Sequence, residues 1–289
     1  MTGDMLEQLD ATFGSLSLQD LAGDYDAIAR AFYAPFPEWA RQTFAEDAIY
    51  HRDRYLDMLG RVYTGGVLEV GSDKPFISYF LRRLHPKAQF TTISMDMPPS
   101  PLPVTQVDIE FEVFPFSDAS FRQAIFTEVL EHLWRDPAWA MWQINRVLEP
   151  GGELFLTTPN ACAADVAQAV LLQSNPNPRS QYFLRLEAGH LHLWTMRELE
   201  LVLGAHGFAV EEMTSANFVE GMEVAEDLLA LLRERAPADR FGQTIRCVAV
   251  KRSEVEKPVY PRVIFPREAP VQMTGALEKW ARAKLRERD

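Results

Sequence analysis

The feature that most constrains the fold of this chain is an alternation of short apolar runs with segments of helical periodicity, which begins at about residue 65. Residues 67–70 predict a buried strand, and residues 77–84 predict a helix. Parallel strands need crossover connections, which are usually helices, so this order is typical of a parallel sheet. We therefore expect an α/β fold, with a Rossmann-like, mostly parallel sheet and helices on both of its faces.

Further apolar runs continue this pattern toward the C-terminus. Four prolines between residues 98 and 103 exclude a regular helix after the second strand, because proline lacks a backbone N–H and its ring clashes with the preceding turn. Asp136–Pro137 predicts a helix start with an aspartate N-cap, and Thr195–Glu198 predicts a capping box on a helix that ends near Gly207. The remaining strands are expected at residues 90–95, 104–109, 124–126, 154–157, 208–210 and 245–250.

The segments that flank the alternating region indicate its boundaries. Residues 1–64 are predicted to be an N-terminal helical cap, since several of their apolar residues have helical spacing. Residues 65–252 would form the main domain, with a lid-like insertion at residues 161–194. Residues 253–289 are expected to be a C-terminal tail with a basic helix, for which a solvated surface helix is the simplest interpretation.

Charge and cysteine usage exclude several classes of protein. Lys and Arg total 29 against 41 Asp and Glu, and the resulting net charge of −12 repels nucleic acid and anionic membranes. No apolar run approaches the roughly 20 residues needed to span a bilayer, and the first ten residues do not resemble a secretion signal. Cys162 and Cys247 lack metal-site spacing and are expected to be buried free thiols in a cytoplasmic protein, with one disulfide as the alternative.

Groups that bind a ligand are expected just after each strand, because open α/β sheets bind ligands at the carboxyl ends of their strands. Gly71 permits a close approach of a ligand to the backbone, but no G-x-G-x-x-G pattern follows, which disfavours a nicotinamide-dependent oxidoreductase. Asp96 follows the second strand and could accept both hydroxyls of a ribose, or simply cap the loop before the prolines. After the third strand, Asp108 beside Ile109 suits the amino group and the ring of an adenine.

The stretch from Phe114 to Asn160 contains the most specific pattern in the chain, with the motifs PF…SF, EVLEH, RVLEPGG and TPN. In order and spacing these motifs resemble the class I S-adenosylmethionine-dependent methyltransferases, in the branch that carries EVLEH, RVL-PGG and TPN. The resemblance covers residues 65–252 and implies a seven-stranded sheet whose last strand is antiparallel. It also implies S-adenosyl-L-methionine as the cofactor, lying across the first four strands.

The same resemblance implies roles for particular side chains. Asp96 would hold the ribose, Glu128 would lie near the methyl-bearing sulfur, and the acid after the third strand is either Asp108 or Glu110. The family commonly has further glycines after the first strand, where this chain has Asp73 and Pro75. The residues expected to line the cofactor are Glu69, Gly71, Ser72, Asp96, Met97, Asp108, Ile109 and Glu128.

Methyl transfer to a hydroxyl requires removal of its proton, and histidine suits this step because its ordinary pKa is near neutrality. His132 and His190 are the expected catalytic residues, with His192 as a further candidate, although a histidine in EVLEH can equally pack at a helix start. Glu128, Glu131, His132 and His190 also resemble the residues with which small-RNA 2′-O-methyltransferases hold magnesium. The motif is frequent in relatives without a metal, so no metal is expected here.

We expect a methyltransferase that acts on a small-molecule or sugar-like acceptor at oxygen, without nucleic acid or membrane partners. The acceptor would lie under a lid made from the N-terminal helices and residues 161–194. The alternative is a catalytically inactive methyltransferase-like protein that serves as a binding or scaffold subunit, which the missing glycines favour. The oligomeric state stays open, with a homodimer through the C-terminal segment as one option. The lid candidates are Tyr33, Tyr50, His51, Tyr182 and His190.

Overall fold

The computed structural model divides the chain into two compact units. The first comprises residues 1–106 together with 218–220, and the second comprises residues 107–217 and 221–289. Within these units the structure describes residues 2–72, 74–95, 99–133, 135–176, 189–218, 223–234 and 236–262.

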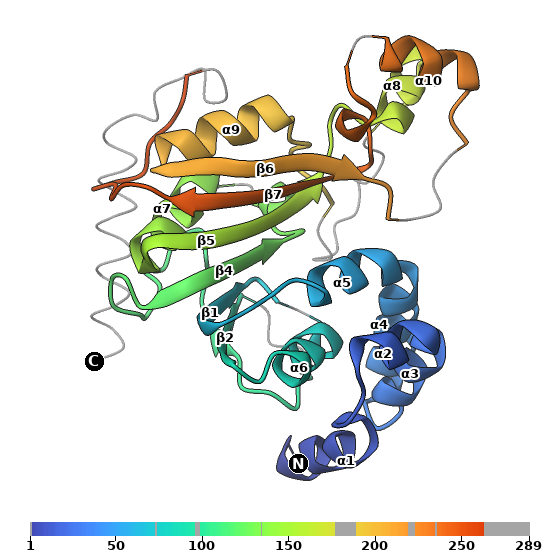
Figure 1. The fold of residues 1–289 in the computed structure, drawn as a ribbon, viewed down its shortest axis with the longest axis vertical. Coiled ribbons are helices and arrows are strands. Elements are labelled where there is room, and N and C mark those ends of the chain that lie inside the picture. Colours follow the sequence, from blue (N-terminus) through green and yellow to red (C-terminus); the bar gives the residue numbers. More distant parts are fainter. Residues whose placement is uncertain are drawn as a thin grey trace. The chain divides into compact units, whose positions relative to one another are not determined.

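The first unit begins with helices that lie beside the helix after the first strand (Figure 1), and their side chains share an apolar core with it. Phe32 lies at the centre of this core, with ring centroids 5.2 Å from Phe76 and 5.3 Å from Tyr79. Within the predicted N-terminal helical cap, residues 38–59 form two helices that meet at His51. The helices are α1 (Thr2–Phe13), α2 (Leu18–Gly23), α3 (Tyr25–Tyr33), α4 (Glu38–Tyr50), α5 (Arg52–Leu59) and α6 (Pro75–Leu84).

Three parallel strands complete the first unit: β1 (Gly65–Val70), β2 (Ala88–Ser94) and β3 (Thr105–Gln106). β3 is shorter than the strand predicted at 104–109. The reason is a turn at Asp108, whose carbonyl accepts hydrogen bonds from the backbone N–H groups of Phe111 at 3.1 Å and Glu112 at 2.8 Å. These local bonds replace the ladder that a longer strand would form.

The second unit contains the other strands: β4 (Phe121–Thr127), β5 (Leu148–Pro159), β6 (Phe208–Ala216) and β7 (Thr244–Lys251). β4 and β5 are parallel, whereas β7 lies between β5 and β6 and is antiparallel to both. The seven-stranded, mostly parallel sheet and the Rossmann-like fold predicted from the sequence are therefore confirmed, including the antiparallel last strand.

The helices of the second unit begin where the capping signals predict. Asp136 accepts a hydrogen bond from Trp139 N at the start of α7 (Pro137–Val147), and Thr195 and Glu198 form a capping box at the start of α9 (Met196–Ala205). α9 lies along β6, and α8 (Ala164–Leu171) lies beside α10 (Glu226–Arg233) (Figure 1). Two short 3₁₀ helices cover Leu130–His132 and Ala238–Arg240. No helix in these described ranges is both long and apolar enough to cross a membrane.

The first part of the predicted tail packs against α7 and the end of α9 within the second unit. Trp142 Nε1 donates a hydrogen bond to Val255 O at 2.7 Å, and Val259 N donates one to the buried His206 at 3.1 Å. Tyr260 donates a third, to Asp136 at 2.6 Å. These bonds hold the tail against α7 and the end of α9 as far as Tyr260, while the predicted basic helix lies outside the described residues.

The two cysteines differ from the expectation in one respect. Both are free thiols, and Cys247 is buried, which raises its pKa to about 12. Cys162, in contrast, is exposed. The prediction that both are buried is wrong because Cys162 lies in the turn before α8 rather than in a strand, with its N–H bonded to the side chain of Asn160.

Candidate active site

Glu69, near the end of β1, is a buried anchor rather than an open ligand. Both of its carboxylate oxygens accept hydrogen bonds from Ser78 Oγ at 2.8 Å, and one also accepts from Thr92 Oγ1 at 2.9 Å. Arg82 Nη1 lies 3.7 Å from the same carboxylate. Burial lowers the pKa of Arg82, and the charge of Glu69 opposes that shift. Glu69 therefore ties β1 to α6 and to β2.

The loop after β1 requires a glycine at its first position. Gly71 has a φ of +78°, in the left-handed region that other residues adopt only at a cost. Its N–H donates to Ile93 O at 2.8 Å, and Ser72 Oγ lies 2.9 Å from Ser78 Oγ. Both Gly71 and Ser72 are half-buried, and the positive φ of Gly71 turns the chain after β1 although two of the family's glycines are missing.

The N-terminal helices hold the rest of this loop. Lys74 Nζ lies 3.7 Å from Asp47 and 5.1 Å from the ring centroid of Phe44, both on α4. At the start of α6, Pro75 has no N–H, and the N–H of Phe76 donates to Tyr33 Oη at 3.4 Å. Two of the N–H groups that could bind a phosphate are therefore missing or engaged, which agrees with the absence of a pyrophosphate motif.

The acids predicted after the second and third strands differ in whether the structure describes them and in how accessible they are. Asp96 and Met97, expected at the ribose, lie outside the described residues. Glu110 is 7% exposed and accepts hydrogen bonds from the backbone of Arg135 at 2.6 Å and Asp136 at 3.1 Å. Asp108 is more accessible, with Arg135 Nη1 3.6 Å away. Of the two alternatives, Asp108 is therefore the acid left accessible to a ligand.

Desolvation raises the pKa of both acids above their usual values. At Asp108 the N–H of Glu110 and the charge of Arg135 oppose the increase. Ile109, between them in the chain, is buried. Asp108 is thus a half-buried carboxylate, while the side chain of its neighbour in the chain is buried.

Glu128 lies in a strained turn directly after β4. Its φ of 55° is in the left-handed region, which costs a residue other than glycine about 1–2 kcal/mol. The neighbouring strand holds it there: Glu128 N donates to Thr157 O, and Thr157 Oγ1 donates to the Glu128 carboxylate, each at 2.9 Å. Such strain is concentrated at functional sites.

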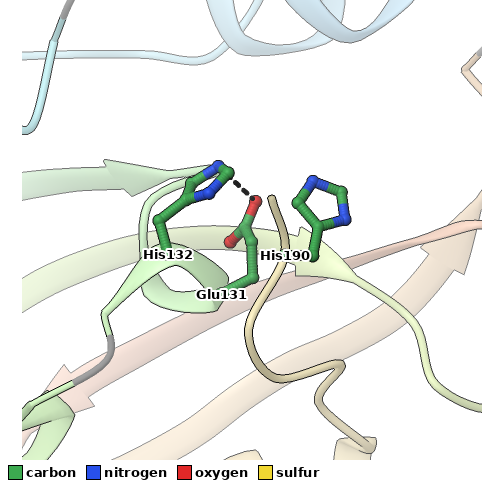
Figure 2. Close-up of side chains that lie close together, drawn as sticks. All are labelled: Glu131, His132 and His190. Atoms are coloured by element: carbon green, nitrogen blue, oxygen red, sulfur yellow. Dashed lines mark ion pairs between the residues drawn. The ribbon is translucent and has the colours of Figure 1, made fainter. Parts of the chain in front are cut away.

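Three side chains of the second unit, Glu131, His132 and His190, gather one turn further along (Figure 2). Glu131 is 0% exposed; its Oε2 accepts a hydrogen bond from Thr158 Oγ1 at 2.9 Å, and its Oε1 lies 3.7 Å from His132 Nε2. The rings of His132 and His190 are 5.2 Å apart between centroids. The site thus combines a buried carboxylate with two half-buried imidazoles.

Backbone contacts bring His190 to this cluster from a distant part of the chain. Leu191 N donates to Glu131 O at 2.8 Å, directly beside His190. The buried Trp194 anchors the same segment, because its carbonyl accepts a hydrogen bond from Ala161 N at 2.9 Å. His192, the further candidate, lies 3.6 Å from Glu198, outside the cluster.

Some functional groups have no signal of their own in the sequence. The hydroxyls of Thr157 and Thr158 orient Glu128 and Glu131, yet threonine in a strand is ordinary, and only their position in the TPN region could have indicated them. Of the lid candidates, Tyr33 is buried in the aromatic core and Tyr50 is exposed. His51 lies 3.8 Å from Asp47, and Tyr182 lies outside the described residues.

Comparison with known families identifies the chain. A family model described as a methyltransferase domain matches residues 42–213, which is more than half of the sequence. The chain belongs to this methyltransferase-domain family. It is an enzyme, and its cofactor is S-adenosyl-L-methionine.

A solved structure has a similar fold at low sequence identity. A chain in the complex between the Haloferax volcanii Trm112 methyltransferase activator and a protein provisionally named a methyltransferase is 14% identical, with a TM-score of 0.50 over 78% of this chain and 98% of that chain. An S-adenosylmethionine-dependent methyltransferase from Mesorhizobium loti is 15% identical, with a TM-score of 0.47 over 71% and 99%. A comparison with curated proteins gave no match.

Proposed function

We propose that this methyltransferase transfers a methyl group to a hydroxyl of a small-molecule or sugar-like acceptor. The observation that carries the proposal is the cluster of His132 and His190 around the buried Glu131 (Figure 2). A hydroxyl is a poor nucleophile until its proton is removed or its pKa is lowered, and imidazole is the side chain best suited to this near neutral pH. Amines need no such help once they are neutral, so the cluster favours oxygen over nitrogen.

The reaction is a displacement in line with the bond that breaks. The acceptor oxygen attacks the methyl carbon, the C–S bond of the sulfonium breaks, and S-adenosylhomocysteine leaves. The acceptor's proton goes to a base, and we propose that His132 and His190 activate the hydroxyl for this step. Glu131, oriented by Thr158, acts as a positioning residue for the imidazoles.

The cofactor is proposed to bind to residues that follow β1, β2, β3 and β4. Gly71 and Ser72 contribute the turned backbone after β1, and Glu69 holds this loop in place. Asp108 contributes a half-buried carboxylate that suits the amino group of adenine, and Ile109, buried next to it in the chain, is the proposed apolar neighbour of the ring. The remaining proposed contacts are Asp96 and Met97 for the ribose and Glu128 for the region of the sulfonium.

The net charge and the sequence pattern support proposals about the acceptor class, the compartment and the domains. The net charge of −12 favours a small acceptor over nucleic acid, and we propose that the protein works in the cytoplasm as a helical cap (1–64), a methyltransferase domain (65–252) and a tail (253–289). The insertion at 161–194 is proposed as a lid over the acceptor, because it carries His190 and is anchored at Trp194.

Calorimetry with the full chain, followed by an activity screen, tests this function. S-Adenosylmethionine and S-adenosylhomocysteine should each bind with one site per chain. In the presence of hydroxylated small molecules and sugars, mass spectrometry should detect an acceptor 14 Da heavier together with S-adenosylhomocysteine. Failure of both cofactors to bind at millimolar concentration, or methylation only of amines, would contradict the proposal.

A further inference from the structure

The same cluster has the composition and spacing of a metal site. Glu131, His132 and His190 each offer one ligand atom, and these atoms all lie within 4.8 Å of one another. We propose that they bind one divalent transition-metal ion, through a carboxylate oxygen of Glu131 and one ring nitrogen of each histidine (Figure 2). This inference reverses the expectation from the sequence that no metal is present.

The distances are close to those that a bound ion requires. Ligand atoms about 2.1 Å from a tetrahedrally coordinated ion lie about 3.4 Å from one another. Glu131 Oε1 and His132 Nε2 are already 3.7 Å apart. All three ligand atoms fall within 4.8 Å of one another, so side-chain rotations that bring the imidazoles closer to Glu131 would complete the site.

The ligand types select the class of ion. Imidazole suits zinc, iron, cobalt and nickel, whereas magnesium and calcium prefer sites made of oxygen atoms. Two histidines with one carboxylate therefore indicate a transition metal rather than magnesium. Three protein ligands also leave coordination positions open for a further oxygen ligand, as in catalytic zinc sites.

The surroundings of the carboxylate are those of an oriented metal ligand. Thr158 Oγ1 donates to Oε2 of Glu131, which fixes the carboxylate and directs the other oxygen toward His132. The backbone bond from Leu191 N to Glu131 O holds the segment of His190 next to the same residue. Hydrogen bonds of this kind, made by residues that do not themselves bind the ion, commonly position metal ligands. A bound cation would also neutralise a carboxylate that the fold keeps entirely out of water.

The role of the ion depends on the proposed function. A bound divalent cation lowers the pKa of a coordinated hydroxyl and holds its oxygen in place. In methyl transfer the acceptor oxygen would lose its proton to solvent while coordinated, and would then form its bond to the methyl carbon as the C–S bond breaks. With the ion bound, His132 and His190 would activate the hydroxyl as ligands of the ion and not as bases that take its proton. Metal binding itself requires neither cofactor nor acceptor.

Titration of the full, tag-free and chelator-treated chain with Co²⁺ tests this proposal, because the visible absorption of Co²⁺ changes when nitrogen ligands bind it. One Co²⁺ per chain should bind, and His190→Ala should weaken binding about tenfold or more, as expected for the loss of a direct ligand. His192→Ala is the matched control, since His192 lies beside Glu198 and should leave the affinity within about twofold of the original.

The metal site would be overturned by the absence of stoichiometric Co²⁺ binding, or by equal affinity of the original protein and His190→Ala for Co²⁺. Loss of binding in His192→Ala as large as in His190→Ala would also contradict it. Calorimetry with S-adenosylmethionine on the same samples separates this result from the proposed function. Cofactor binding without Co²⁺ binding overturns only the metal, whereas Co²⁺ binding without cofactor binding overturns only the methyl transfer.

Discussion

Two buried carboxylates, Glu69 in the first unit and Glu131 in the second, have similar positions relative to the strands but different neighbours. Each lies near the carboxyl end of a strand, and each accepts a hydrogen bond from a threonine on a neighbouring strand, Thr92 or Thr158. Glu69 engages both oxygens within the protein and has Arg82 beside it. Glu131 has one oxygen held by Thr158 and the other directed toward imidazole.

The difference in neighbours indicates that the two carboxylates have different roles. A carboxylate beside a guanidinium, with hydroxyls on both oxygens, is fixed in one state and serves the structure of the loop. A carboxylate beside histidines is next to groups that can change protonation or bind an ion near neutral pH. We therefore propose that Glu69 holds the loop at which the cofactor is expected to bind, and that Glu131 takes part in activation of the acceptor.

The largest effect is expected from Glu69→Gln. The substitution keeps the shape but removes the charge beside Arg82, and breaking a buried ion pair costs about 3 kcal/mol. Urea unfolding measures this loss of stability. Arg30→Ala is the control, because the pair between Arg30 and Glu46 is exposed and should contribute little. Equal stability of Glu69→Gln and the original protein would remove the distinction between the two carboxylates.

Gly71→Ala should have the next largest effect, through the cofactor. A side chain at a φ of +78° costs roughly 1 kcal/mol and shifts the loop, so the affinity for S-adenosylmethionine should fall about tenfold. Gly151→Ala is matched to it, with a φ of +76° and open space at the added methyl group. Calorimetry should find unchanged cofactor affinity in Gly151→Ala, and a similar loss in both variants would contradict a specific role of the first loop.

Thr158→Val should slow the chemical step with little effect on cofactor binding. Valine has the same shape but removes the donor to Glu131 Oε2, and a loss of about 1 kcal/mol corresponds to a roughly fivefold lower kcat. Thr92→Val is its counterpart, since Glu69 keeps Ser78 and Arg82, and its kcat should change less. Steady-state kinetics of both variants would contradict this view if Thr92→Val were the slower enzyme.

The smallest effect is expected from Lys74→Ala, which removes a partly exposed contact to Asp47 and Phe44. Its cost should be about 0.5 kcal/mol in cofactor affinity, since partly exposed ion pairs contribute little. A double-mutant cycle with Asp47→Asn, followed by calorimetry, measures the coupling. An additive double variant would show that α4 does not help to hold the loop after β1.

The sequence predicts those parts of the molecule that depend on neighbours along the chain. The cap of α7 at Asp136 and the capping box of α9 at Thr195 follow from residues within one turn, and both are correct. The seven-stranded sheet follows from the order of apolar runs and from the motif resemblance. Local rules fail for β3, because backbone bonds to Asp108 end it early.

The site is predictable only in part because its geometry depends on distant contacts. EVLEH and the later histidine indicate His132 and His190, but their proximity depends on the bond between Leu191 and Glu131. The register of β5 beside β4 decides which threonine meets which glutamate, and no local pattern specifies it. The choice between Asp108 and Glu110 likewise requires the backbone partners of Glu110 near the start of α7.

The most direct test measures cofactor binding and the rate of methyl transfer on the same preparation of His190→Ala. We predict that the variant binds S-adenosylmethionine within about twofold of the original affinity, while a single turnover with the acceptor slows about 100-fold. Loss of cofactor binding in this variant, or an unchanged rate of transfer, would contradict the account. In that account the cofactor binds to the residues that follow β1 to β4, and the cluster that contains His190 activates the acceptor.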